Sequence, residues 1–159
     1  MTSILTILTF CLLAIGCGAS SQNQSQDADA SRDAISQGIS GTLIERSGNF
    51  MPTPENDTPH RGTEEPHQGT IEVYNPINVS GLGQGPYYKI TEEPLHSLKT
   101  NEEGHFSVQL SPGIYSLFIK TDRGLYAKTF NGQGIIGPVE VTEGKVTEVE
   151  MILDNEATY

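Results

Sequence analysis

Cysteine is scarce in this chain, and the positions of its two cysteines limit the chemistry available to it. Both Cys11 and Cys17 lie near the start of the 159 residues. The remainder of the chain therefore cannot form a disulfide, has no thiolate nucleophile and cannot bind zinc through cysteine. We expect the folded part to be held together by packing alone.

Positive charge and hydrophobic residues are also in short supply. Nine Lys and Arg stand against 20 Asp and Glu, so the formal net charge at pH 7 is -11. Nucleic acid and anionic lipid headgroups would meet this chain with electrostatic repulsion, and neither is expected as a partner. A hydrophobic content of 35% allows one core with disordered segments, whereas 17 Gly and 9 Pro favour short strands joined by turns.

Motifs of catalysis and cofactor binding are missing as well. No Gly-x-Ser-x-Gly elbow occurs. The run GLGQGP at residues 81–86 has the glycines of a phosphate loop, but no Gly-Lys-Ser/Thr and no helix pattern follow it. His96 and His105 have no oriented partner that can be assigned from the sequence. We predict that the protein is not an enzyme and uses no cofactor.

The ligand types of a zinc site do occur together once. His60 and His67 bracket Glu64 and Glu65 in HRGTEEPH. Prolines next to the outer positions break any regular element that could fix the spacing of these side chains. A solvated loop is therefore expected there, and no metal ligand is assigned.

An apolar run, ILTILTFCLLAI, occupies residues 4–15 and is too short to span a bilayer. Its length and position are typical of the apolar region of a signal peptide. The run ends in Ala14-Ile15-Gly16-Cys17, which resembles the lipobox of bacterial lipoproteins. The alternative is an ordinary signal peptide that is cleaved nearby.

The lipobox resemblance implies a signal peptide at residues 1–16 and a lipid attached to Cys17, which would become the new N-terminus. Acyl chains such as palmitate on Cys17 would anchor the chain stably. The implied location is the bacterial cell envelope, at its outer membrane. Residues 17–37 then supply the lipidated cysteine and a flexible tether rich in Ser, Gln, Ala and Asp.

The most regular pattern of the chain lies at residues 105–120, HFSVQLSPGIYSLFIK. Apolar residues alternate with polar ones before Ser111-Pro112-Gly113, and a second alternating run follows. We predict a β-hairpin whose apolar face needs a second layer. Tyr115 and Leu117 are expected in the core, facing Phe106 and Val108, whereas replacing Ser116 by alanine should have almost no effect.

Shorter runs complete an all-β fold, a small antiparallel β-sandwich of about seven strands at residues 38–153. A long Pro/His/Glu-rich loop at 47–69 separates the first two strands, and residues 154–159 should fray. The remaining strands are expected at 38–46, 70–74, 87–90 with 95–99 as one bent strand or an edge strand, 125–130, and 139–141 with 149–153 as a closing hairpin.

The turns and strands together resemble the carboxypeptidase regulatory-like domain. The residues that carry the resemblance are Thr100, Glu103-Gly104, Phe106, Val108, Leu110, Pro112-Gly113, Tyr115 and Leu117. This resemblance covers residues 38–153 and implies a transthyretin-like sandwich. Such domains are usually non-catalytic, so it also implies a role in binding, adhesion or structure.

If each strand crosses the sandwich once, successive loops alternate between its two ends. One end would then gather carboxylates that could attract a weakly bound Ca²⁺, although a solvated acidic rim is the simpler interpretation. These carboxylates belong to Glu55, Asp57, Glu64, Glu65, Glu102, Glu103 and Asp122.

The function that these patterns predict is that of a non-catalytic, membrane-anchored lipoprotein that presents a binding module at the cell envelope. Its partners would be the membrane, through the lipid, and an envelope protein or carbohydrate that the sequence does not identify. A structural or assembly accessory lipoprotein that pairs with another envelope protein is the alternative. An enzyme and a Ca²⁺-binding module rank below both.

Overall fold

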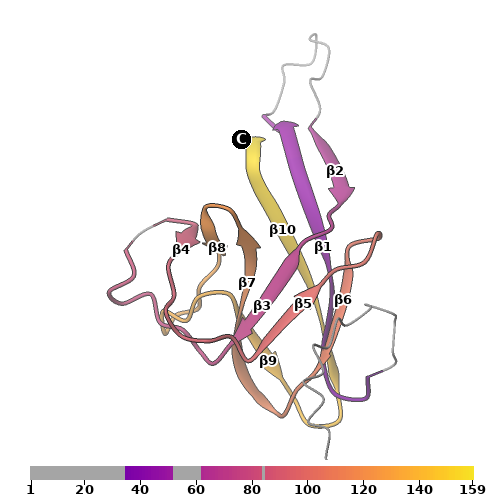
Figure 1. Ribbon diagram of the computed structural model, residues 1–159, viewed down its shortest axis with the longest axis vertical. Helices are drawn as coiled ribbons and strands as arrows, with labels where there is room; N and C mark the ends of the chain where they lie inside the picture. The colour runs from indigo at the N-terminus through magenta and orange to yellow at the C-terminus, as the bar shows by residue number, and fades with distance from the viewer. Residues whose placement is uncertain (1–34, 52–61, 84) are drawn as a thin grey trace, which may run out of the picture.

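A computed structural model describes residues 35–51, 62–83 and 85–159, and these form an all-β sandwich of two sheets (Figure 1). The predicted fold class is confirmed. Among the described residues there is no helix able to span a membrane. The described residues form ten strands rather than about seven, because one strand lies within the predicted loop at 47–69 and residues 87–99 supply two.

The first sheet is built around β1 (Gly38–Asn49). On one side β1 pairs in parallel with β10 (Val146–Thr158). On the other side it pairs antiparallel with β6 (His105–Gln109) over its first part and with β2 (Thr63–Pro66) over its last part. The strand β1 therefore forms the middle of this sheet, and β10 lies at its edge.

The second sheet is built around β7 (Gly113–Thr121). One side of β7 pairs with β3 (Thr70–Tyr74), which in turn pairs with β5 (His96–Lys99). The other side pairs with β9 (Pro138–Val141) and with β8 (Gly124–Tyr126), and β8 pairs with β4 (Tyr87–Tyr88). All these pairs are antiparallel.

Strand positions are predicted better than strand partners. The second predicted strand coincides with β3, but both predicted hairpins are wrong. The strands β6 and β7 lie in different sheets, and so do β9 and β10. Alternating apolar residues occur equally in two paired strands and in two strands that pack face to face, so the alternation does not separate the two cases.

Between the sheets lies the larger hydrophobic core. Leu117 is buried there in one cluster with Phe106 and Val108, as predicted, and Tyr115 packs against the cluster while partly exposed. Gly41 on β1 permits the close approach of β10, because a Cβ at this position would lie 2.3 Å from the Val149 carbonyl oxygen. The other buried members are Ile39, Leu43, Ile71, Val73, Leu98, Leu110, Ile119, Tyr126, Val141 and Leu153.

A second cluster covers the opposite face of β7. Phe118 is fully buried there, with edge contacts to Tyr74 and Tyr88. Ser116 is also fully buried, and its hydroxyl accepts a 2.9 Å hydrogen bond from the backbone N–H of Ile77. The expectation that Ser116→Ala is nearly silent is therefore wrong. The loops that follow β3 and β8 fold over this face and exclude water from it.

Three predictions for the chain ends and edges also change. Residues 154–158 do not fray, because they continue β10, and residues 156–158 pair with the last three residues of β1. The predicted loop at 47–69 contains the end of β1 and all of β2. The strands β4 and β5 lie at opposite edges of the second sheet, so residues 87–99 are not one bent strand, and the alternative of an edge position is the one observed.

Candidate binding groove

Several residues with a predicted role lie outside the described part of the chain. Cys17 and the signal peptide at 1–16 are among them, as are His60, Glu55 and Asp57. Lipid attachment at Cys17 therefore stays a prediction.

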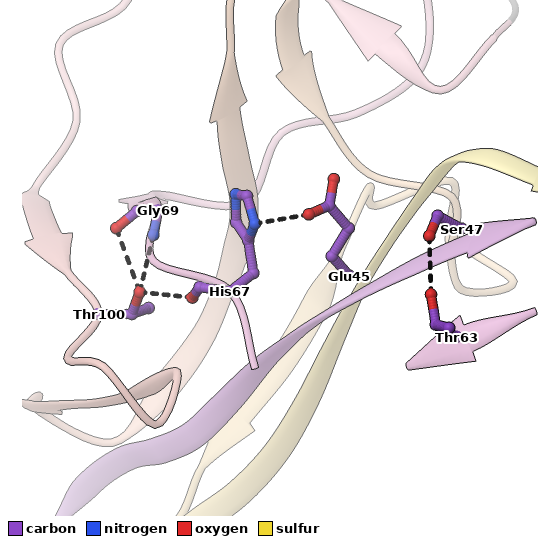
Figure 2. A network of polar contacts seen from close by, with 6 residues as sticks. All are labelled: Glu45, Ser47, Thr63, His67, Gly69 and Thr100. Carbon is purple, nitrogen blue, oxygen red and sulfur yellow. Dashed lines mark hydrogen bonds and ion pairs between the residues drawn. The ribbon is translucent and has the colours of Figure 1, made fainter. Parts of the chain in front are cut away.

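The other histidine of HRGTEEPH has a defined position. The Nδ1 atom of His67 lies 3.0 Å from Oε2 of Glu45 on β1, and Figure 2 shows the ring directed at that carboxylate. Thr100 donates a 2.8 Å hydrogen bond to the His67 carbonyl oxygen and accepts a bond of the same length from the Gly69 N–H. These contacts fasten the chain between β2 and β3 to the end of β5, which is a structural role.

The predicted gathering of carboxylates at one end is found only in part. His67 and the turn at Gly104 lie side by side, because the Leu43 backbone bonds to both of them. Glu64, however, pairs with Arg46 at 2.7 Å, and Glu102 and Glu103 are exposed. Residues 35–51, 62–83 and 85–159 bring together no group of three His, Cys, Asp or Glu side chains that could hold a metal ion.

A groove of about 450 Å³ opens between the two sheets along β10. Its apolar surface comes from both sheets, and three of its side chains, Val139, Val149 and Met151, pack on the core while remaining partly exposed. Leu117 and Ile119 of β7 line it more deeply. The groove is thus an opening at the side of the sandwich into which apolar groups can reach.

Asp154 lies at one end of this groove and joins the two sheets. Its carboxylate accepts hydrogen bonds from the Tyr126 hydroxyl, from Lys128 Nζ at 2.6 Å and from the Tyr159 hydroxyl at 2.8 Å. The Asp154 side chain is only 7% exposed, whereas its partners Lys128 and Tyr159 are exposed. The hydrogen bonds connect β10 of the first sheet to the end of β8 in the second.

This environment changes the acidity of both central groups. Burial by itself would raise the pKa of Asp154, but the hydrogen bonds from Lys128, Tyr126 and Tyr159 outweigh it and hold the pKa below its ordinary value. Burial, together with the bond to Asp154, raises the pKa of the Tyr126 hydroxyl. At neutral pH the pair is therefore an anionic acceptor held by a neutral donor.

Aromatic and cationic side chains extend this contact beyond the groove. The ring of Tyr159 stacks on Phe50 at a centroid distance of 5.8 Å, and Lys128 Nζ lies 5.4 Å from the centroid of Tyr159. Arg46 lies over Phe50 and, through Glu64, joins β1 to β2. Figure 1 shows β1, β2 and β10 continuing past the second sheet at this end of the molecule.

Sequence reasoning missed both the groove and the Asp154 contacts. Tyr126 and Lys128 are two residues apart, as side chains on one face of a strand would be, and this was the only signal available. The sequence predicts a frayed tail that includes Asp154, where its side chain would have no fixed partner. Comparison of the chain with family models, with curated proteins and with solved structures finds no match.

Proposed function

We propose that this protein is a lipoprotein of the bacterial cell envelope whose carboxypeptidase regulatory-like sandwich is a non-catalytic binding module. The groove along β10 is its ligand-contacting surface. The observation that carries the proposal is the partial exposure of Val139, Val149 and Met151 in a concave site with a preformed ion pair at its end. Ligand sites in proteins are typically concave and mostly apolar, with a few fixed polar groups.

The chemistry of the groove favours binding over catalysis. Its described lining contains neither His, Ser nor Cys. The carboxylate of Asp154 already accepts three hydrogen bonds, which leaves it poorly placed to take a proton from a substrate. Fixed bonds of this kind suit a module that holds the mouth of a groove in one shape.

The direction of β1 determines which end of the sandwich an N-terminal anchor would hold toward the membrane. Because β1 and β10 are parallel, both begin at one end of the sandwich, and Asp154 lies toward the other. A tether that enters at Gly38 would therefore hold the starting end toward the membrane. Twelve residues of β1 span roughly 40 Å, so the Asp154 end of the groove would face away from the bilayer.

The anchor is tested by mass spectrometry of the membrane fraction. We expect a mature chain that begins at an acylated Cys17, and a Cys17→Ser chain that is released from the membrane because it lacks the acyl chains. An unmodified Cys17, or a Cys17→Ser chain that remains equally bound, would contradict the proposal.

The groove is tested by site-specific cross-linking in the native envelope. A photoreactive residue at position 129, which lines the groove and is exposed, should give a discrete product. The same residue at position 103, in the exposed turn before β6, should give none. Equal yields at the two positions would contradict a role for the groove.

A further inference from the structure

The backbone of β10 is available to a further strand on one side. Within the described residues β1 is the only strand that pairs with β10, which leaves β10 as an edge of the first sheet. An edge strand presents a row of N–H and C=O groups to any chain that can lie beside it. Near its start, this edge is partly covered by β9, where Thr147 bonds to the Glu140 carbonyl oxygen. The accessible stretch therefore begins after Thr147.

Side chains alternate along this stretch in a way that specifies a partner. Val149 and Met151 turn toward the groove, whereas Glu148 and Glu150 are exposed between them. A strand added beside β10 continues both faces of the sheet. Its side chains on one face would enter the groove, and those on the other would lie next to the two carboxylates.

The charges of the added strand decide whether it can pair with β10. Opposite charges on neighbouring strands are favourable, and like charges directly opposite each other are unfavourable. A second copy of this chain, paired through its own β10, would bring glutamates of the two copies together on one face. The net charge of -11 opposes such a pair further.

We infer that the groove binds an extended peptide segment of another protein, in which Lys or Arg alternates with aliphatic residues. This inference rests on the proposed function. The segment adds a strand to the edge of β10. Its aliphatic side chains fill the groove beside Val149 and Met151, and its basic side chains lie beside Glu148 and Glu150.

Synthetic peptides test the inference with the purified full chain. A ten-residue peptide of alternating Lys and Val should bind, as measured by calorimetry. An analogue of alternating Glu and Val should bind at least about tenfold more weakly, because the cross-strand charges become alike. Equal binding of the two peptides would overturn the charge requirement.

The backbone requirement has a separate control. Two N-methylated analogues, one methylated on the lysines and one on the valines, keep the side chains but block opposite edges of the peptide strand. We expect at least one of them to lose binding by about tenfold or more, because its pairing edge has no N–H donors. Undiminished binding of both would overturn strand addition.

A matched pair of protein variants separates this site from general attraction to an acidic protein. Glu148→Lys combined with Glu150→Lys should weaken binding of the Lys/Val peptide by about tenfold or more. Glu102→Lys combined with Glu103→Lys changes the net charge equally in an exposed turn, and should alter binding by less than about twofold. Equal losses would overturn the inference.

Failure of the inference is distinguishable from failure of the proposed function. If the peptides do not bind but position 129 still cross-links to one envelope product, the ligand of the groove is of another class and only the inference is overturned. If neither peptide binding nor cross-linking is seen, the groove has no binding role.

Discussion

The two sides of the second sheet carry the same chemical arrangement for different purposes. On the outer side, Glu72 accepts hydrogen bonds from the Tyr74 hydroxyl at 2.6 Å and from Lys120 Nζ at 2.8 Å. On the side facing the first sheet, Asp154 accepts bonds from Tyr126 and Lys128. Each is a nearly buried carboxylate between a tyrosine and a lysine.

The difference between the two lies in what they connect. Glu72, Tyr74 and Lys120 belong to adjacent strands of one sheet, so the outer arrangement adds to a pairing that the backbone already makes. Asp154 belongs to the other sheet from Tyr126, and no backbone pairing joins their strands. Glu72 therefore adds side-chain hydrogen bonds to strands that are already paired through their backbones. Asp154 instead links the two sheets through side chains alone, at the end of the groove.

The hydrophobic clusters on the two sides of the second sheet also differ in the elements that supply their residues. The cluster between the sheets comes mainly from alternating strand residues. The outer cluster is closed by loop residues such as Ile77 and Ile136, which bring an apolar layer onto a face that an isolated sandwich would leave in water. This second layer makes β7 a strand that is buried on both faces.

Of the substitutions that test this comparison, Phe118→Ala should have the largest effect on stability. If the outer cluster is a true core, Phe118→Ala should lower the free energy of unfolding by about 3 to 5 kcal/mol, since a large, fully buried side chain is lost. Urea unfolding followed by far-UV circular dichroism measures it. Ile114→Ala, at an exposed position of the same strand, is the control. A loss below about 1 kcal/mol for Phe118→Ala would mean that only one core supports the fold.

Asp154→Asn tests the arrangement between the sheets. Loss of its charged hydrogen bonds should lower the free energy of unfolding by about 2 to 3 kcal/mol at pH 7. Because folding lowers the pKa of Asp154, the stability contributed by the carboxylate is present above its unfolded pKa of about 4 and is lost as the pH falls through the lower folded value.

The difference in unfolding free energy between the wild-type chain and Asp154→Asn should therefore shrink below about pH 4. Urea unfolding at several pH values measures it, with the exposed Asp122→Asn as a control that should change little at any pH. A difference that stays constant down to about pH 2 would show that the charge of Asp154 contributes nothing.

Ser116→Ala should have the smallest of these effects on stability, because it removes a single hydrogen bond on the outer side of the second sheet. The substitution leaves the Ile77 N–H without its acceptor under the covering loop, and should cost about 1 to 2 kcal/mol in unfolding free energy. Ser97→Ala, at an exposed position of β5, should cost almost nothing. If the two variants unfold at the same urea concentration, water reaches Ser116 and the outer side is not a core.

Sequence periodicity alone predicts that the chain forms β-strands and which side chains face the core between the sheets. Ile71 with Val73 and Leu117 with Ile119 alternate with period two, and this spacing is a local property that survives in any sandwich. The sequence also indicated the boundaries of β3 and the absence of cysteine chemistry from the folded part.

Which strands pair, and therefore where the groove lies, cannot be predicted from the local sequence and depends on the tertiary fold. Backbone hydrogen bonds can form between any two extended segments. The residues of β1 therefore do not indicate that its parallel partner is β10, which lies far along the chain. Because β10 pairs with β1, Asp154 lies in a strand rather than in the predicted tail, and its carboxylate contacts Tyr126. The loops over Phe118 were equally hidden, because loop residues bury side chains without the periodicity that identifies a buried face.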